Sequence, residues 1–192
     1  MKTKISILFL LSLLVLTSKS FAQEAVIELK SAILTTKIEV FGTKVVTKTY
    51  YDDYGKKQAA IATTTMGNVN QVTKGILNGK ETISFDLNTK KGVKVPTPET
   101  INYINITDEI KEKYQLEEVG EEEYQDRKCK VYSCITEQNG QKVNAKVWIW
   151  KGLSLKSEIN AGIVNIVTET TEIIENAEIP NGIFDIPEDI QF

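Results

Sequence analysis

The chain has 192 residues, with 23 Lys and Arg, 26 Asp and Glu and no histidine, and its net charge is −3. Without histidine the chain cannot use His-based acid–base catalysis, Ser-His or Cys-His nucleophile pairs, or the commonest zinc ligand, so we expect no metal site, no cofactor and no catalytic residues. The lysines are scattered among acidic residues, which argues against a nucleic-acid partner.

Residues 1–22 have the pattern of a secretory signal peptide. Lysines within the first four residues precede an apolar run at 5–16, and Ser20-Phe21-Ala22 gives a small-x-small ending before Gln23. The apolar run is too short to span a bilayer, and no later run is long enough to do so. Because Gln23 is not a cysteine that could be acylated, the sequence predicts a periplasmic protein without a lipid anchor. Residues 23–192 then form one domain, with 20 basic and 26 acidic residues and a net charge of about −6.

The first half of the mature chain has the composition of strands, because Val, Ile, Thr and Tyr dominate between turn signals. Gly42 is a candidate bulge or break within a long run at 26–50, and Asp52-Asp53-Tyr54-Gly55 ends that run with a turn. Asn78-Gly79 predicts a hairpin, after which apolar residues alternate along a strand at 81–87.

One helix is predicted, from Thr107 to Gln115, after two prolines have interrupted the strands. Thr107 can cap the helix, acidic residues follow in its first turn and lysines lie near its last turn. Ile106, Ile110 and Tyr114 recur every four residues, so we expect this thin apolar stripe to pack on a sheet.

Strand signals resume after Gly120 and continue nearly to the end of the chain. Asn139-Gly140 predicts another hairpin turn, and Lys151-Gly152 separates the next two strands. Successive hairpins of this length give an antiparallel sheet that must curl or close to hide its edges. The strands expected in the whole chain are 26–50, 57–65, 81–87, 128–136, 141–150, 153–160 and 163–174, with a short edge piece at 184–187.

Cys129 and Cys134 would meet an oxidising compartment. In one extended strand their Cα atoms lie roughly 16 Å apart at about 3.3 Å per residue, and the odd offset directs them to opposite faces. A disulfide needs about 4.4 to 6.8 Å. Either both are free thiols or a bend brings them together. If the chain were instead a eukaryotic secreted protein, Asn105-Ile106-Thr107 would be a glycan acceptor.

Trp148 and Trp150 are the most informative apolar pair, because residues two apart in a strand share one face. They could pack under the helix or a loop, as aromatics on a sheet commonly do. They could also line a concave apolar surface and contact a hydrophobic ligand, and we take them as the candidate ligand-binding residues. The opposite face, from Val143 to Ile149, is apolar too, so both faces of this strand should be covered.

Acidic residues offer the remaining candidate chemistry. Glu121, Glu122, Glu123 and Asp126 cluster near a turn, and a charge run before a strand is usually a solvated loop. Asp52 and Asp53 lack the alternating oxygen ligands of a calcium loop, so a turn is the better interpretation. A carboxylate-based hydrolase would need two acids that converge in a cleft.

Four segments together resemble a known group of proteins. They are Tyr51-Asp52-Asp53-Tyr54-Gly55-Lys56, the stretches 102–108 and 124–132, and the stretch 146–157 with its Lys-Val-Trp-Ile-Trp-Lys-Gly-Leu-Ser-Leu-Lys-Ser sequence. With the signal peptide, they look like uncharacterised periplasmic proteins related to outer-membrane lipoprotein-sorting proteins. The resemblance implies an incomplete antiparallel β-barrel, closed by short helices, whose apolar cavity takes lipoprotein acyl chains.

The sequence therefore predicts a mainly β fold, a curved antiparallel sheet with one or two short helices, in a single half-barrel domain at 23–192. The predicted function is to bind a hydrophobic small molecule or a lipoprotein acyl chain in the periplasm, as a non-enzymatic carrier or chaperone-like protein. The alternative is an envelope module for protein interaction or sensing, with a protein partner and no cavity. The identity of the ligand, the partner and the oligomeric state stay open at this point.

Overall fold

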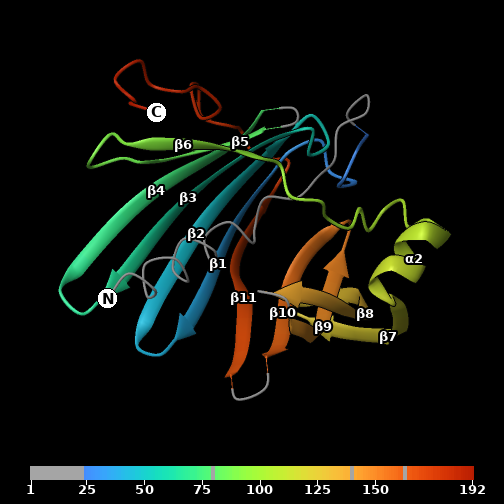
Figure 1. Cartoon of the computed structure of the whole chain (residues 1–192). Helices are drawn as coiled ribbons and strands as arrows, with labels where there is room; N and C mark the ends of the chain where they lie inside the picture. The colour runs from blue at the N-terminus through green and yellow to red at the C-terminus, as the bar shows by residue number, and fades with distance from the viewer. Residues whose placement is uncertain (1–23, 79–80, 139–140, 162–163) are drawn as a thin grey trace.

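A computed structural model describes residues 24–78, 81–138, 141–161 and 164–192 (Figure 1). The predicted signal peptide at 1–22, Gly79 and the Asn139-Gly140 turn lie outside the described residues. In the described part, eleven strands form one antiparallel sheet and one short helix accompanies it. The elements are β1 Ala32–Val40, β2 Thr43–Asp52, β3 Lys57–Met66, β4 Val69–Asn78, β5 Glu81–Asp86, β6 Gly92–Pro96, α2 Asp108–Tyr114, β7 Glu117–Tyr124, β8 Arg127–Gln138, β9 Gln141–Trp150, β10 Leu153–Ala161 and β11 Val164–Glu175.

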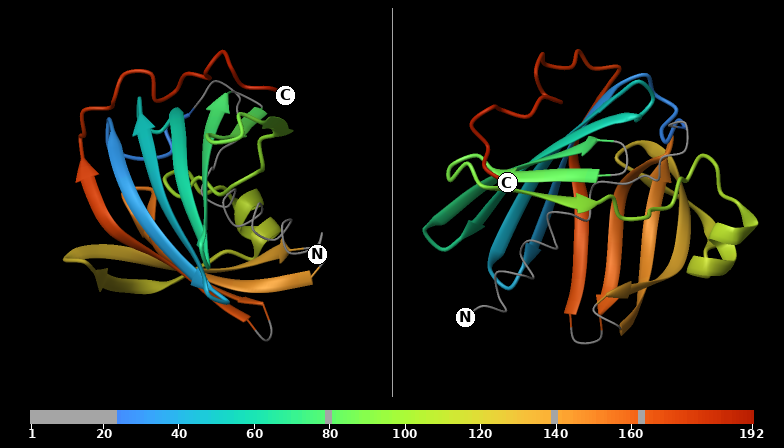
Figure 2. Two further views of the ribbon diagram at one scale, coloured as in Figure 1. Left: turned by 90° about the vertical axis from the view of Figure 1, so that its left-hand side faces the viewer. Right: turned by 45° about the horizontal axis from the view of Figure 1, so that its top comes forward.

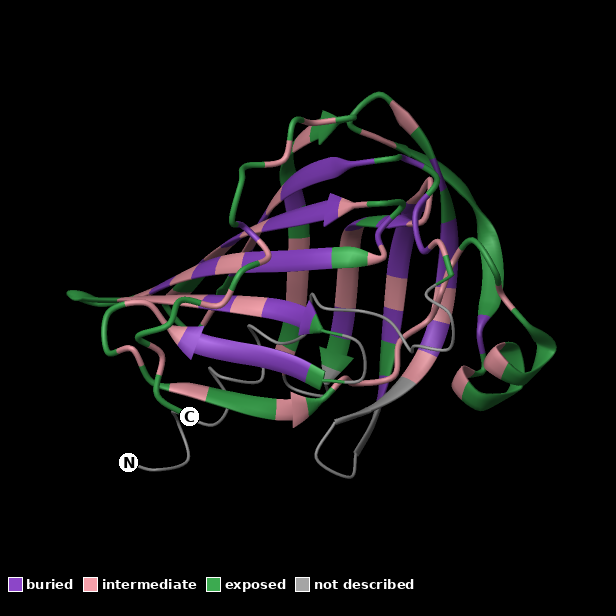
Figure 3. Cartoon of the chain, turned by 90° about the horizontal axis from the view of Figure 1, so that it is seen from above, coloured by how far each residue is buried: buried purple, intermediate pink, exposed green. Residues whose placement is uncertain are grey.

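The sheet consists of two meanders joined in its middle. Its strand order is β6-β5-β4-β3-β2-β1-β11-β10-β9-β8-β7, so the first and last strands pair with each other and β6 and β7 form the two edges. The sheet curves strongly but stays open between these edges (Figures 2 and 3). The connection from β6 to β7, residues 97–116, contains α2 and bridges the two edges. The predicted fold class, a curved antiparallel sheet not closed into a barrel, is confirmed.

Backbone pairing connects one face of the sheet across both meanders. Thr47 and Thr36 are paired across β2 and β1, Ile38 pairs with Thr168 of β11, and Thr168 pairs with Ser157 of β10. Ser157 in turn pairs with Val147 of β9. Since paired residues share a face, these residues define what we call the inner face, and their strand neighbours define the outer face.

Left-handed turn residues explain how the long run at 26–50 is divided. Phe41 and Gly42 have φ values of 50° and 72° and form a two-residue hairpin turn between β1 and β2. Both central residues of such a turn need positive φ, and glycine adopts it without strain. Gly42 is therefore a hairpin turn and not a bulge within one strand. Residues 26–30 precede β1 as a bent segment.

Three strands were not predicted, and one predicted piece is absent. β4 carries few apolar residues at its start, β6 is short and ends at Pro96, and β7 contains the glutamate run interpreted as a solvated loop. β7 is an edge strand whose residues are exposed on both faces except Tyr124, so its sequence lacks the alternation of a half-buried strand. Residues 184–187 do not form an edge strand: Phe184 ends a turn, and 185–187 have no regular secondary structure.

The outer face of the first meander is covered by the C-terminal tail, residues 177–192. Large side chains of β1, β2, β4 and β5 form a buried cluster with Ile183, and further tail residues pack against it. Figure 1 shows this tail lying across the end of the sheet near β5 and β6. Lys74, which is buried on β4, donates from Nζ to the carbonyl oxygens of Gly182 at 3.4 Å and Asp185 at 3.1 Å. The predicted alternation within 81–87 is confirmed, since Ile83 and Phe85 lie in this cluster and Leu87 packs against it.

Candidate functional site

A cavity of about 420 Å³ lies on the inner face, between the centre of the sheet and two segments that cross it. The first segment is the start of the described chain at 24–27, and the second is the connection between β6 and α2. The sheet contributes Leu34, Thr36, Ile38, Thr49, Tyr51, Ser154, Ser157 and Thr168; the connection and the start of α2 contribute Glu99 to Tyr103, Asn105, Thr107, Glu109 and Ile110; the remaining lining residues are Glu24, Val26, Ile27 and Gly152.

Hydrogen bonds hold the 24–27 segment against the sheet, and Gly152 allows the segment to approach closely. The backbone N–H groups of Val26 and Ile27 donate to the Tyr54 carbonyl at 3.0 and 3.3 Å, and Glu28 N–H donates to the Lys151 carbonyl at 3.0 Å. A Cβ at Gly152 would lie 2.4 Å from the Val26 carbonyl oxygen, so only glycine permits this close approach. The hairpin turn between β9 and β10 therefore fixes one wall of the cavity.

The connection between β6 and α2 is tied to the same segment. Asn102 donates from Nδ2 to the Ala25 carbonyl at 3.0 Å, and Asn105 donates from Nδ2 to Glu24 Oε2 at 3.0 Å. The Tyr103 ring packs against Tyr132 of β8 with a centroid separation of 5.4 Å. These contacts make the connection and the 24–27 segment one continuous cover over the cavity.

The helix forms as predicted and is fixed by its caps and its apolar stripe. Thr107 is the N-cap and accepts a hydrogen bond at Oγ1 from Ile110 N–H at 3.3 Å, and Gln115 is the left-handed C-cap. Ile106, Ile110 and Tyr114 pack against a cluster on the inner face of β8, β9 and β10. Val147 and Ile149 of β9 belong to that cluster, so the helix covers the face of β9 opposite Trp148.

The cavity offers apolar contacts, hydroxyl groups and carboxylates. Burial raises the pKa of Tyr51 to about 12, and burial together with the neighbouring Cys134 and Tyr132 raises the pKa of Tyr103, so both phenols are neutral near pH 7. Among the described residues no Lys or Arg lines the cavity. The described chain also holds no group of three or more His, Cys, Asp or Glu suited to a metal ion. The arrangement is suited to holding a molecule with apolar and neutral polar parts.

Neither Trp148 nor Trp150 is among the lining residues of this cavity. Both belong to or pack against a buried cluster that also contains the lining residues Val26, Ile27, Leu34 and Tyr51. Trp148 is buried, donates from Nε1 to Glu122 Oε2 at 2.8 Å, and has Lys146 and Lys156 near its ring at 4.6 and 4.4 Å. Trp150 is half-buried, with cations of Arg127 and Lys151 near its ring. Their role as ligand-binding residues stays a prediction.

Both cysteines are free and buried, which confirms the interpretation as thiols. Cys129 lies in the cluster with Trp148, whereas Cys134 lies in the cluster under α2, on the other side of the sheet. Burial raises the pKa of each thiol, and for Cys129 the nearby Arg127 partly opposes this effect. The two sulfur atoms thus face different parts of the core.

Sequence reasoning missed most of the cavity lining. The signal that could have located it is the alternation in β2, where Thr47, Thr49 and Tyr51 share a face that carries hydroxyl groups. The other signal is the stretch 102–108, which the family resemblance had identified as a motif and which supplies Asn102, Tyr103, Asn105 and Thr107 to the cavity. The predicted turn at Asp52 and Asp53 is present, with Asp53 at φ 48°.

No family model and no curated protein matches this chain. Its fold is similar to that of an uncharacterised conserved protein from Thermus thermophilus, with a TM-score of 0.58, 10% identity, and coverage of 85% of this chain and 90% of that one. It is also similar to a chain of the MucA/MucB complex of Pseudomonas aeruginosa, with a TM-score of 0.53 and 14% identity; the match covers 88% of this chain but only 59% of that one.

A weaker likeness joins this chain to a putative outer membrane lipoprotein-sorting protein domain from Vibrio parahaemolyticus, with a TM-score of 0.40, 10% identity, and coverage of 81% of this chain and 89% of that one. In the part of the chain that the structure describes, no helix is long and apolar enough to cross a membrane.

Proposed function

We propose that this protein binds a hydrophobic ligand, a lipid or a lipoprotein acyl chain, in the inner-face cavity and acts in the periplasm as a non-enzymatic carrier or chaperone-like protein. The observation that supports this most directly is the cavity of about 420 Å³, which the sheet, the 24–27 segment and the helix connection enclose together. Cavities of roughly 300–1,000 Å³ with mainly apolar walls are typical of small-molecule sites.

The volume of the cavity favours one chain over several. A heavy atom with its hydrogens fills about the volume of one water molecule, roughly 30 Å³. A cavity of about 420 Å³ therefore holds on the order of fourteen heavy atoms. This is enough for a single acyl chain of moderate length, and the aliphatic side chains of Leu34, Ile38 and Ile110 would contact it.

Native mass spectrometry of the purified protein, before and after incubation with membrane extract, tests the proposal. We expect a bound mass of lipid size, and displacement of the neutral fluorescent probe N-phenyl-1-naphthylamine by that lipid. Ser157→Phe places a ring in the cavity from β10 and should abolish both signals. Ser133→Phe is the matched control, because Ser133 pairs with Lys146 and lies on the outer face. Equal binding by wild type and S157F would contradict the proposed site.

The same titration tests the two tryptophans. If Trp148 and Trp150 contact the ligand, W148F and W150F should each weaken binding in protein that circular dichroism shows to be folded. W148F also loses the hydrogen bond to Glu122, so its stability should fall in either case. If the ligand lies only in the inner-face cavity, both variants should bind as wild type does, because neither residue lines that cavity. The affinities of the two variants therefore decide between the two locations.

A protein partner is the second candidate, because the MucA/MucB structure to which this chain is similar in fold is a complex of two proteins. Capture of envelope proteins by immobilised protein, followed by mass spectrometry, tests this candidate. A partner that wild type and S157F retain equally would favour a surface platform. A partner that S157F loses would indicate that it enters the cavity.

A further inference from the structure

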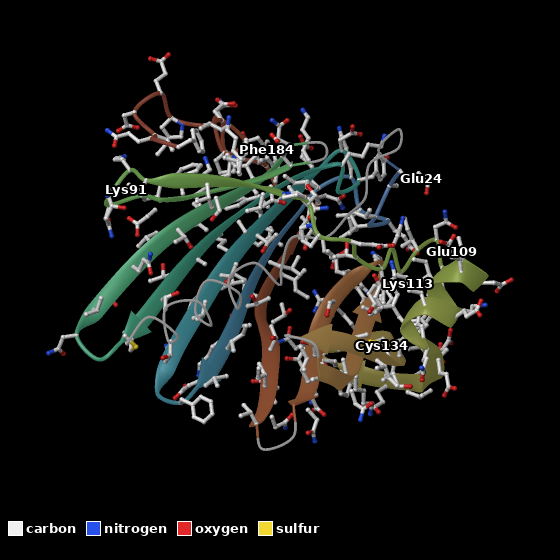
Figure 4. All side chains as sticks on the ribbon, in the orientation of Figure 1. Glu24, Lys91, Glu109, Lys113, Cys134 and Phe184 are labelled. Atoms are coloured by element: carbon white, nitrogen blue, oxygen red, sulfur yellow. The ribbon has the colours of Figure 1, made fainter. Side chains whose placement is uncertain are left out.

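Two of the three carboxylates at the rim of the inner-face cavity, those of Glu24 and Glu109, form no ion pair within the part of the chain that the structure describes. Glu24, Glu99 and Glu109 line the cavity. Lys113 forms an ion pair with Glu99, whereas Glu24 accepts only a neutral amide hydrogen bond from Asn105 among its described contacts. The side chains of Glu24 and Glu109 are exposed, so they mark the part of the cavity that meets solvent. Figure 4 shows both residues on the side of the molecule where Lys113 also lies.

The polar side chains that the sheet contributes to the cavity carry hydroxyl groups. The sheet supplies Thr36, Thr49, Ser154, Ser157 and Thr168 to the lining. A hydroxyl group both donates and accepts hydrogen bonds, so it can meet an alcohol, an ester or an amide without a charge on either side. An anionic head group would find hydroxyls but no cation among the described lining residues, and it would pass two carboxylates at the rim.

We propose that the cavity takes a single-chain amphiphile with an uncharged or cationic head group and discriminates against the same chain with an anionic head. This inference rests on the proposed function and names the class of ligand for its site. Like charges repel by an amount that grows as water is excluded, so an anion held near Glu24 and Glu109 is disfavoured and a cation is favoured. Because both carboxylates are exposed, salt screens their effect.

Three ligands with the same twelve-carbon chain test the inference: dodecan-1-ol, dodecanoate and dodecylammonium. Each is titrated against protein expressed from the full-length sequence and loaded with N-phenyl-1-naphthylamine, at low salt and about pH 9. If residues 1–22 are removed, the α-amino group at Gln23 is mostly neutral at this pH, because its pKa is about 8. We expect dodecanoate to bind at least about tenfold more weakly than dodecan-1-ol, and dodecylammonium at least as tightly as the alcohol.

A double variant, Glu24→Gln with Glu109→Gln, provides the charge-specific readout. Relative to dodecan-1-ol bound by the same variant, the substitutions should strengthen dodecanoate binding and weaken dodecylammonium binding, each by about three- to tenfold. A merely structural defect would change the affinities of all three ligands in the same direction. The control, E178Q/E188Q, changes the same amount of charge at exposed positions of the C-terminal tail and should shift none of them.

The outcomes separate this inference from the proposed function. Binding of dodecanoate as tight as that of the alcohol, or an E24Q/E109Q variant with no opposite shifts, overturns the inference and leaves the proposed function standing. Failure of every chain and of the neutral probe to bind overturns the proposed function and the inference with it.

Discussion

Gly152 is the position where one methyl group should disturb both the fold and the cavity. Its φ is +82°, a left-handed conformation that costs an L-residue about 1–2 kcal/mol. An added Cβ would also lie 2.4 Å from the Val26 carbonyl oxygen and 3.0 Å from the Ile27 Cα, and both are backbone atoms that cannot rotate away. Gly152→Ala must therefore push the 24–27 segment off the sheet.

The size of the effect follows from what that displacement breaks. The segment is held by backbone hydrogen bonds from Val26 and Glu28 to the neighbouring turns, each worth about 1 kcal/mol net. Adding two lost bonds to the left-handed strain gives a loss of about 3 kcal/mol in the free energy of unfolding for G152A. Ligand affinity should fall as well, because Val26 and Ile27 line the cavity.

Alanine substitutions at two other glycines in left-handed turns distinguish the cost of backbone strain from the cost of a steric clash. Gly42 has φ +72° and nothing within 4 Å of an added Cβ, so G42A should cost only the strain, about 1 kcal/mol, and leave ligand binding intact. At Gly55, φ is +79°, and an added Cβ would lie 2.5 Å from Cγ2 of Val26, a side-chain atom that can move. The loss of stability in G55A should therefore lie between those of G42A and G152A. Urea denaturation of the three variants gives the comparison. A G152A protein no less stable than G42A would refute the reasoning.

The remaining predictions concern the two thiols, the helix cap, the C-terminal tail and one turn. Iodoacetamide should label Cys129 and Cys134 slowly in the folded protein and rapidly in urea, and reductant should leave the intact mass unchanged; fast native labelling would contradict their burial. Thr107→Ala removes the N-cap of α2 and should cost about 1 kcal/mol in a urea melt. Lys74→Met leaves two tail carbonyls without their donor, so limited proteolysis should cut the tail faster than in wild type. Burial alone would raise the pKa of Asp86, but hydrogen bonds from turn N–H groups and a side-chain amide outweigh it and lower that pKa. Asp86→Asn should therefore be less stable than wild type above about pH 4, with the difference lost as the pH falls through the folded pKa.

The helix and β9 could be predicted because capping residues, turn residues and apolar periodicity mark them within a short stretch of sequence. The helix was predicted within one residue at each end, because Thr107 and the apolar repeat act within a few turns of backbone. β9 was predicted with its observed bounds, because apolar residues alternate along the whole strand and Lys151-Gly152 ends it. Edge strands such as β7 carry no such alternation, because neither face is buried.

The location of the cavity depends on a contact that no local pattern contains. β1 pairs with β11 across more than 130 residues of chain, as the hydrogen bond from Thr171 Oγ1 to the Thr35 carbonyl illustrates. That pairing joins the two meanders, so that Ser157 and Thr168 of one line the same cavity as Thr36 and Thr49 of the other. The alternation in β9 correctly separated Val147 from Trp148 but could not say which of them faced inward. The aromatic pair was the stronger signal in the sequence, whereas the helix and the cavity occupy the other face.

Side-chain size explains why the inner face of the first meander leaves a cavity whereas its outer face is filled. On β2 and β5 the outer positions carry Tyr50, Ile83 and Phe85, and the C-terminal tail packs directly on this cluster. The inner positions next to these residues carry small hydroxyl residues, Thr49 on β2 and Ser84 on β5, and Tyr51 is the large inner residue of β2. Large residues on the convex side fill the space between sheet and tail, and small residues on the concave side leave space under the helix connection. The alternation of large outer and small inner side chains along these strands therefore determines where the cavity lies. Replacing the small inner residues by large ones would turn the cavity into a packed core.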